Sequence, residues 1–589
     1  MVGATTVAAT TFRDLPAANA DHDGVEITMR TGYVASFDGL PLAVDLTLPR
    51  DGKTGPRPLV VFFHGWTEDK KAWESTTRDA KDAAHAHFNQ LTFAARGYAV
   101  LNVTIRGWHD SCGPGRASVR HLPRTLPNDC RDKEYWVHVA DPKVEIRDAQ
   151  HLIARLVDDG FALPDKIGII GGSYGGAHAW MLALAGDEVA MPDGNRVPWR
   201  AKDGRPLHVA AIAPLYTWSS LLGALLPNGR VTDRDAEHPA RSPVGVPLGT
   251  YLTGFFAGGP AAANGYYATP TRDASSDFTA WFARFNAGPP FIDDKRIDAL
   301  LSRALDELER RSPVRMPVPK TRVPVFQVQG LTDPLFPAVH ALVMRNKVLA
   351  ADPTYAITTF LGDVGHASAQ NPRSDWDRAH PALDAFFDHW LKGEGAAPAS
   401  DVTVSTTTCG DDTKEVMRGP SFAALAKSKL TFRDTTLRAT TTVDVNRSSF
   451  AIDPLLAKPC KPVPVGQTSL SAWTFKPGRA VTIIGSPEIV LSARFLGNEA
   501  PIFARLWDVA GATQTLVSRG VYRWVAPSRI ATLSAQRITF QTSVAAWELA
   551  EGHALKLEVV GYGAPEHATT LLPATITVES VELAVPTRD

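Results

Sequence analysis

Continuous apolar runs that end in glycine recur along the first two-thirds of the chain. Three of them are PLVVFFHG (58–65), YAVLNVTIRG (98–107) and KIGIIGGSYGG (166–176). Such runs are typical of strands that are buried on both faces, as in a parallel sheet. Residues 144–160, which precede the third run, carry their apolar side chains at helical spacing. Because strands that alternate with helices form a doubly covered parallel sheet, the sequence predicts an α/β fold.

The same pattern returns later, after an interruption. The runs VPVFQVQG (323–330) and YAITTFLG (355–362) have the same character, but the region before them is rich in Gly, Pro and aromatic residues and then becomes helical. An insertion at this point covers the carboxyl ends of the strands, where ligands bind. We therefore predict a helical cap over 216–320, between two parts of an α/β domain (1–215 and 321–398).

A different pattern begins after residue 398. Short segments of alternating hydrophobicity follow one another, including VTIIGSPEIVLSARF (481–495) and ALKLEVVGYG (554–563). This pattern predicts an all-β sandwich or jelly roll over 399–589. The length of 589 residues agrees with more than one domain, since it exceeds what one hydrophobic core supports.

Charge and hydropathy exclude two classes of partner. The formal net charge is -1, without a long run of one sign. A nucleic-acid binder needs a basic surface that neutralises phosphates, so this class is excluded. No stretch approaches the roughly 20 apolar residues that span a bilayer, so a membrane-spanning segment is excluded as well. The expected partner is a small-molecule or polymeric substrate.

The four cysteines form two local pairs, Cys112 with Cys130 and Cys409 with Cys460. Their spacing does not fit a zinc or redox motif, and it suits two disulfides in an oxidising compartment. The N-terminus lacks the cationic and apolar segments of an intact signal peptide. The expectation is a secreted or otherwise extracytoplasmic protein; four buried thiols in a cytoplasmic protein are the alternative.

One G-x-S-x-G motif occurs in the chain, at 171–175, with Ser173 at its centre. It lies between a buried-strand run and a segment of small residues that begins a helix. A serine in such a turn is lifted clear of the sheet, and the glycines avoid clashes with the neighbouring strand and helix. We predict Ser173 as a nucleophile and the N–H of Tyr174, at the helix N-terminus, as an oxyanion donor. The alternative is a glycine-rich turn in a non-catalytic sheet.

A serine nucleophile needs a base and an orienting carboxylate, which follow it in the order Asp or Glu, then His. Asp333 comes just after the run 323–330, and His366 follows the run 355–362. Because the carboxyl ends of parallel strands meet at one edge of a sheet, we predict that both lie beside the serine. Asp363 is an alternative acid, but it is too near His366 in sequence to approach easily from the opposite side.

A second oxyanion donor should come from the loop after an early strand. His64-Gly65-Trp66 follows the VVFF run and fits an arrangement in which the backbone N–H of Trp66 points to the oxyanion. The alternative is a glycine turn that only ends a strand. The sequence has neither Cys and His at zinc spacing nor a phosphate-binding loop, so we expect no metal and no cofactor.

These motifs together resemble the cocaine esterase/X-prolyl dipeptidyl-peptidase family, also called CocE/NonD hydrolases. The resemblance is carried by FAARGYAVLNVTIRG (93–107), GGSYGG, GLTDPLF, GDVGHA and the segment 481–495. It implies an α/β-hydrolase domain, a helical cap, a jelly roll, and cleavage of esters or amides through an acyl-enzyme. It also implies Ser173 as nucleophile, Asp333 as acid, His366 as base and Tyr174 as a backbone oxyanion donor.

This sequence departs from the family pattern in two loops. Where relatives often carry a tyrosine hydroxyl as the other oxyanion donor, this chain has His64-Gly65-Trp66-Thr67. The Arg-Gly-x-Gly-x-Ser-x-Gly loop of the family here becomes Arg106-Gly-Trp-His-Asp-Ser-Cys-Gly113. The Trp66 amide therefore replaces the tyrosine in the predicted site.

The expected activity is hydrolysis of esters with bulky apolar or aromatic groups, polyesters included, because the cap is rich in aromatic residues. These are Tyr251, Phe255, Phe256, Tyr266, Tyr267, Trp281, Phe282 and Phe285. An X-Pro or aminoacyl peptidase, or an amino-acid ester hydrolase, is the enzymatic alternative. It needs carboxylates that hold a substrate ammonium, for which the candidates are Asp233, Asp235, Glu237, Asp293 and Asp294. A non-catalytic carbohydrate-binding protein with a vestigial hydrolase fold is the alternative from another class.

Overall fold

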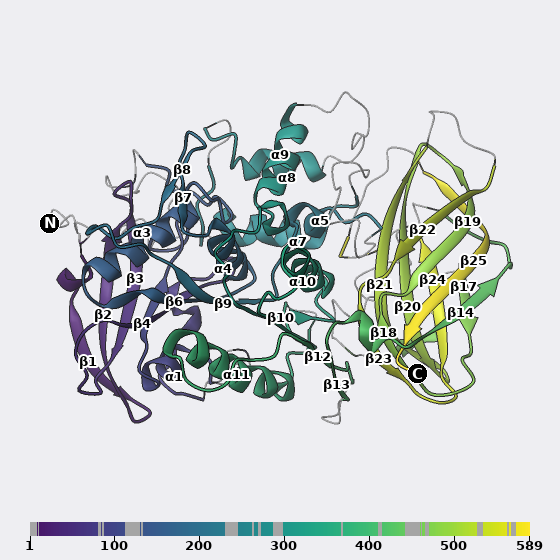
Figure 1. Ribbon diagram of the computed structural model, residues 1–589. Coiled ribbons are helices and arrows are strands. Elements are labelled where there is room, and N and C mark those ends of the chain that lie inside the picture. Colours follow the sequence, from purple (N-terminus) through teal and green to yellow (C-terminus); the bar gives the residue numbers. More distant parts are fainter. Residues whose placement is uncertain are drawn as a thin grey trace.

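The computed structural model describes residues 9, 11–79, 84, 87–111, 130, 133–229, 245–261, 264–268, 272–286, 299–366, 369–409, 415–441, 460, 462–465, 471–526, 534–561, 563, 565–566 and 573–589. Its α/β part and its β-rich part lie beside each other, with the C-terminus in the β-rich part (Figure 1).

An 11-stranded sheet forms the centre of the α/β part, in the order β1-β2-β3-β5-β4-β6-β9-β10-β11-β12-β13. The central strands from β5 to β12 are parallel, and the flanking pairs are antiparallel. The strands are β1 (Ala17–His22), β2 (Val25–Ala35), β3 (Pro41–Pro49), β4 (Arg57–Phe63), β5 (Ala99–Val103), β6 (Ala162–Gly172), β9 (Val209–Leu215), β10 (Val325–Gly330), β11 (Ile357–Gly362), β12 (Val402–Ser405) and β13 (Val416–Gly419). A small pair, β7 (Glu188–Ala190) and β8 (Arg196–Pro198), lies outside it.

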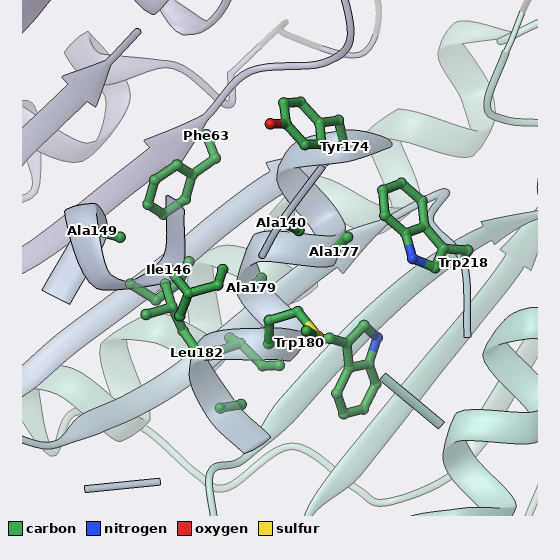
Figure 2. Packing of buried hydrophobic residues seen from close by; sticks show 14 of the residues in the cluster. Phe63, Ala140, Ile146, Ala149, Tyr174, Ala177, Ala179, Trp180, Leu182 and Trp218 are labelled. Atoms are coloured by element: carbon green, nitrogen blue, oxygen red, sulfur yellow. The ribbon is translucent and has the colours of Figure 1, made fainter. Parts of the chain in front are cut away.

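Helices cover both faces of this sheet (Figure 1). One face carries α3 (Glu145–Asp158), α4 (Tyr174–Ala185) and α10 (Val339–Ala351); the other carries α1 (Gln90–Ala95) and α11 (Arg373–Phe387). Figure 2 shows Ile146 of α3, Phe63 of β4 and Leu182 of α4 within the buried cluster on the first face. The predicted α/β architecture is confirmed.

Strand β4 shows why its sequence is a continuous apolar run. Leu59, Val61 and Phe63 belong to the buried cluster that includes α3 and α4. Val60 and Phe62 belong to the cluster on the opposite face, with α1 and α11. Successive strand side chains point to opposite faces, so a strand between two helical layers needs apolar residues at every position.

Two features of the sheet differ from the expected outline. Strand β9, which separates β6 from β10, was not among the predicted runs, although VAAIAPL is fully buried. The sheet also continues past residue 398, because β12 pairs with β11 and β13 pairs with β12. The last two strands of the α/β sheet thus come from the region that the sequence pattern assigned to the sandwich.

The inserted region supplies helices near the carboxyl ends of the strands (Figure 1). They are α5 (Leu221–Leu225), α7 (Gly249–Phe256), α8 (Phe278–Asn286) and α9 (Ala299–Arg310). Helix α8 packs on both α7 and α9, and α9 packs on α5. We refer to these helices as the cap.

The C-terminal part is an antiparallel β-sandwich, as predicted. One sheet has the order β22-β19-β25-β18-β23, with β14 and β15 also paired to β25, and the other has the order β16-β21-β20-β24-β17. The strands are β14 (Ser428–Asp434), β15 (Arg438–Thr441), β16 (Val463–Pro464), β17 (Ala472–Phe475), β18 (Val481–Gly485), β19 (Glu488–Leu496), β20 (Glu499–Ala510), β21 (Thr513–Val525), β22 (Gln536–Gln541), β23 (Ala545–Leu549), β24 (Ala554–Val560) and β25 (Thr575–Thr587).

The sandwich is bonded directly to the cap. The Gly229 N–H donates to the carbonyl of Val521 at 2.8 Å, and the Gln541 N–H donates to the carbonyl of Gly229 at 3.0 Å. Val246, which precedes α7, packs in a small buried cluster with Phe503, Val521 and Val560. The cap segment therefore lies between β21 and β22 and is held by both.

A disulfide joins Cys409 to Cys460, as one of the two predicted pairs. Cys112 lies outside the described residues, so the other pair stays a prediction. Among the described residues, none of the helices combines enough length and apolar character to cross a membrane.

Candidate active site

Ser173 occupies a sharp turn between strand β6 and helix α4. Its φ is 55° and its ψ is -115°, a strained conformation for a residue other than glycine. Two hydrogen bonds hold this turn: the Ser173 N–H donates to the carbonyl of Leu215 at 2.9 Å, and the Thr217 hydroxyl donates to the carbonyl of Ser173 at 2.7 Å. The side chain thus projects above the carboxyl edge of the sheet.

The glycines around Ser173 leave room for this turn. A Cβ on Gly171 would lie 2.3 Å from the backbone of Gly175, and a Cβ on Gly175 would lie 2.1 Å from the carbonyl oxygen of Phe63. Both distances are too short for non-bonded atoms. The motif therefore allows helix α4 to approach the end of β4 without a side chain between them.

Gly175→Ala is expected to lower the free energy of unfolding by about 3 kcal/mol, because the new methyl group overlaps a backbone carbonyl that cannot move aside. Urea unfolding measures the change. Gly254→Ala is the matched control, since its Cβ would meet no atom within 4 Å, and it should be neutral or slightly stabilising in helix α7. Equal stability of both variants would contradict the prediction.

Three strand ends bring a serine, a histidine and an aspartate together. His366 Nε2 lies 2.8 Å from Ser173 Oγ, and His366 Nδ1 lies 2.6 Å from Asp333 Oδ2. A carboxylate at Nδ1 keeps the ring proton there, so Nε2 is left to accept the serine proton. The residues follow β6, β10 and β11, as the sequence predicted.

Asp333 is buried, and both of its carboxylate oxygens accept hydrogen bonds. Besides the imidazole, its Oδ2 accepts the backbone N–H of His366 at 3.1 Å, while Oδ1 accepts those of Leu335 at 2.9 Å and Phe336 at 3.2 Å. The alternative acid, Asp363, accepts instead from the side chains of Thr332 and Gln370. It forms the base of the loop that carries His366.

The loop after β4 also borders Ser173. His64 is buried there; burial lowers its pKa to about 3, so its ring is neutral. Its Nδ1 donates to the carbonyl of Gly65 at 2.7 Å, and its Nε2 accepts the N–H of Ile105 at 2.9 Å. Trp66 borders the space beside Ser173 and packs edge-on against Tyr174. This places both predicted oxyanion residues next to the nucleophile.

An apolar pocket opens beside Ser173 and Tyr174, between the sheet and the cap. Six of the eight cap aromatics that the sequence suggested line it. The lining consists of Trp66, Val139, Ser173, Tyr174, Trp218, Leu221, Leu225, Leu252, Phe255, Phe256, Tyr267, Phe278, Trp281, Phe282, Phe285, Leu308, Arg311 and Phe336. Tyr251 borders a second space instead, and Tyr266 borders neither.

Arg311 is the charged member of the described pocket lining. Its guanidinium donates to the carbonyls of His138 at 2.6 Å and Ser275 at 2.7 Å and contacts Glu307. Its charge is thus already compensated. The five carboxylates suggested as partners for a substrate ammonium lie outside the described residues.

A second, more polar groove also borders Ser173. It is bordered by His366, which does not border the apolar pocket, and by several hydroxyl, amide and carboxylate groups. These polar groups belong to Thr67, Glu68, Tyr216, Thr250, Tyr251 and Asn371. The nucleophile therefore stands between two spaces of different polarity.

Sequence reasoning did not identify several pocket residues, among them Val139, Trp218, Arg311 and Phe336. They come from connecting segments far apart in the chain and follow no motif. The position of Phe336, three residues after Asp333, is the one signal that was available.

Comparison with known proteins gives the family of this chain. The family model described as X-Pro dipeptidyl-peptidase (S15 family) matches residues 38–368, more than half of the chain. A curated relative, dipeptidyl aminopeptidase BIII of Pseudoxanthomonas mexicana, is 31% identical over 156 residues; the match covers 24% of this chain and 18% of that protein. This chain therefore aligns with less than a fifth of that relative's length.

Solved structures match over nearly the whole chain. An α-amino acid ester hydrolase is 15% identical, with a TM-score of 0.63 and coverage of 100% of this chain and 99% of that one. A CocE/NonD family hydrolase from Staphylococcus aureus is 11% identical, with a TM-score of 0.60 and coverage of 99% of both chains. An aminopeptidase from a marine sediment Thaumarchaeota archaeon is 14% identical, with a TM-score of 0.56 and coverage of 95% and 96%. These likenesses show the fold, a mixed α/β sheet followed by a C-terminal antiparallel β-sandwich.

The matched segment 38–368 contains the serine, the aspartate and the histidine described above. The resemblance that the sequence motifs indicated is thereby confirmed. The chain belongs to the X-Pro dipeptidyl-peptidase (S15) family and is a serine hydrolase.

Proposed function

We propose that this protein hydrolyses carboxylic esters that carry a bulky apolar or aromatic acyl group, through an acyl-enzyme on Ser173. The observation that carries the proposal is the apolar, aromatic-lined pocket that opens directly beside the serine. A serine nucleophile with a paired histidine and aspartate supplies the chemistry.

The first half of the reaction forms the acyl-enzyme. His366 Nε2 takes the proton of Ser173 as Oγ attacks the ester carbonyl, and Asp333 stabilises the imidazolium that results. The backbone N–H groups of Tyr174 and Trp66 stabilise the oxyanion. The imidazolium then gives its proton to the alkoxide as the ester C–O bond breaks. In the second half, water takes the place of the alcohol and the same steps release the acid.

The position of His366 supports an assignment of the two spaces to the two halves of the substrate. The group that protonates the leaving alcohol must lie within hydrogen-bond reach of its oxygen. His366 borders the polar groove and not the apolar pocket. The alcohol therefore occupies the groove, and the acyl group occupies the apolar pocket.

The pocket lining favours uncharged acyl groups over amino-acyl groups. A peptidase of the kind named by the family model, or an amino-acid ester hydrolase, needs an anionic partner for the substrate ammonium. The described lining contains no carboxylate, and its charged residue is the cation Arg311. Burying an ammonium here without a partner would be costly. A polyester with aromatic acyl units would present the same group to the pocket.

A substrate panel tests the proposal. We expect p-nitrophenyl benzoate and butyrate to be hydrolysed with kcat/KM at least about tenfold above that of aminoacyl- and X-Pro-p-nitroanilides, because the acyl pocket offers apolar burial. Preferred cleavage of the nitroanilides would contradict it and favour the peptidase alternative. Labelling by a fluorophosphonate excludes a vestigial site, since a non-catalytic carbohydrate-binding protein would stay unlabelled.

A further inference from the structure

The segment that precedes helix α3 contains two successive non-glycine residues in the left-handed region. Val139 has a φ of 56° and Ala140 a φ of 55°. This conformation brings Cβ too close to the backbone, and it is least favourable for a β-branched residue such as valine. Contacts from the rest of the molecule must hold such a segment in place.

Glu145, the first residue of α3, supplies the main contact. Its carboxylate accepts the backbone N–H of His138 at 2.6 Å and also the backbone N–H of Ala140. The two bonds are made on either side of Val139. Glu145 is buried, and its place in the first turn of a helix is favourable for a negative charge. The carboxylate thus fixes the backbone conformation at Val139.

The cap holds the same segment from the other side. Arg311, just after helix α9, donates through Nε to the carbonyl of His138 at 2.6 Å. The Val137 N–H donates to the carbonyl of Tyr266 at 2.9 Å. Ala140 is fully buried in the cluster around helix α4 (Figure 2). Val139 itself borders the apolar pocket together with Ser173 and Tyr174.

We propose that Glu145 is a positioning residue that sets acyl-group specificity, because its bonds to the flanking N–H groups hold Val139 as a wall of the acyl pocket. The inference rests on the function proposed above, in which the acyl group occupies this pocket. Glu145 does not border the pocket and acts through Val139. A bulky planar acyl group fits only while this wall stays in its left-handed position.

A competing route leads through the nucleophile helix. Glu145 Oε2 lies 3.7 Å from Nε2 of His178 in α4, and burial together with the Glu145 carboxylate raises the pKa of Tyr174. Loss of the carboxylate could therefore disturb α4 instead of the wall. Any test must separate these two routes. It should be run at pH 8.5, because burial raises the pKa of Glu145 to about 7.

Sulfonyl fluorides provide the measurement. Phenylmethanesulfonyl fluoride and methanesulfonyl fluoride both transfer their sulfonyl group to the serine oxygen with loss of fluoride, but only the first places a ring in the acyl pocket. Inactivation is followed by intact mass, and the rate with phenylmethanesulfonyl fluoride is divided by the rate with methanesulfonyl fluoride. This ratio, compared between wild type and Glu145→Gln, reports how well the acyl pocket accepts a ring. The amide oxygen of the introduced glutamine can accept one of the two N–H groups, but the amide NH₂ would face the other N–H, donor against donor. We therefore expect the ratio to fall about tenfold.

Ala140→Gly separates the two routes. Glycine adopts a positive φ without strain, so in the double variant E145Q/A140G the segment should return to its native conformation and the ratio to within about twofold of wild type. Ala140→Gly alone is the matched control and should keep the wild-type ratio. A disturbed α4 would not be repaired by this glycine.

Two results would overturn the inference: an unchanged ratio in E145Q, which includes equal slowing of both reagents, or a fall that A140G does not repair. If E145Q does not fold, Val139→Ala tests the wall itself, and an unchanged ratio in V139A would overturn the inference. Both reagents react with the serine itself, so the ratio is obtained even if the natural substrate is an amide. Failure of the ester proposal and failure of this inference are therefore separate results.

Discussion

Ser173→Ala is expected to reduce ester turnover by about three orders of magnitude or more while the protein stays folded. The variant removes the oxygen that forms the acyl-enzyme, and the backbone N–H groups that stabilise the oxyanion remain. Residual hydrolysis by water in the same site sets the lower limit. The measurement is kcat/KM with p-nitrophenyl esters, together with urea unfolding of the same preparation.

Ser219 offers a matched control for this substitution. It is buried, and its Oγ lies 2.9 Å from Nδ1 of His340, so it forms a second serine–histidine pair in the same domain. It borders neither of the two spaces beside Ser173. Ser219→Ala should keep turnover within about threefold of wild type, since it removes only a structural hydrogen bond. Comparable losses in the two variants, or turnover retained in folded Ser173→Ala, would refute the assignment of Ser173.

Asp333→Asn is expected to lower kcat by about three to four orders of magnitude with a small effect on KM. The Asp333 carboxylate accepts four N–H groups, two of them from His366. An amide has one acceptor oxygen and one donor nitrogen, so its N–H would face either the imidazole or the backbone. If it faces the imidazole, the ring adopts the tautomer with the proton on Nε2 and no longer accepts the serine proton.

Asp363→Asn tests whether this effect is specific. Asp363 is equally buried and lies on the loop that carries His366, but it is bonded to Thr332 and Gln370 rather than to the imidazole. Its substitution should cost less than about tenfold in kcat. Steady-state kinetics of both variants decide between the two acids. A larger loss at Asp363 than at Asp333 would reverse the assignment.

The three residues at the ends of β6, β10 and β11 were predictable because of a property of parallel sheets. Each follows an apolar run, and the carboxyl ends of such strands meet at one edge whatever lies between them in the chain. Strand β9 was missed although VAAIAPL is as apolar as the others. It follows the short β7–β8 pair and runs directly into the cap, so neither a helical pattern nor a glycine marks its limits.

The pocket could be predicted in kind but not in detail. The aromatic content of the cap was visible in the sequence, and most of those residues do line the pocket. Val139 was not predictable, because it reaches the pocket through a backbone conformation that its residue type disfavours. The groups that stabilise this conformation, Glu145 at the start of α3 and Arg311 after α9, explain it. Local propensity carries no information of that kind.

The bonds between Gly229 and strands β21 and β22 have a consequence for protein engineering. The described residues that line the acyl pocket all precede residue 337, yet the cap that supplies many of them is fastened to the sandwich. A cap transplanted from a relative would therefore need the sandwich of that relative to keep the shape that it has there. The cap and the sandwich are best exchanged together, because the C-terminal module holds the segments that lead into and out of the first cap helices.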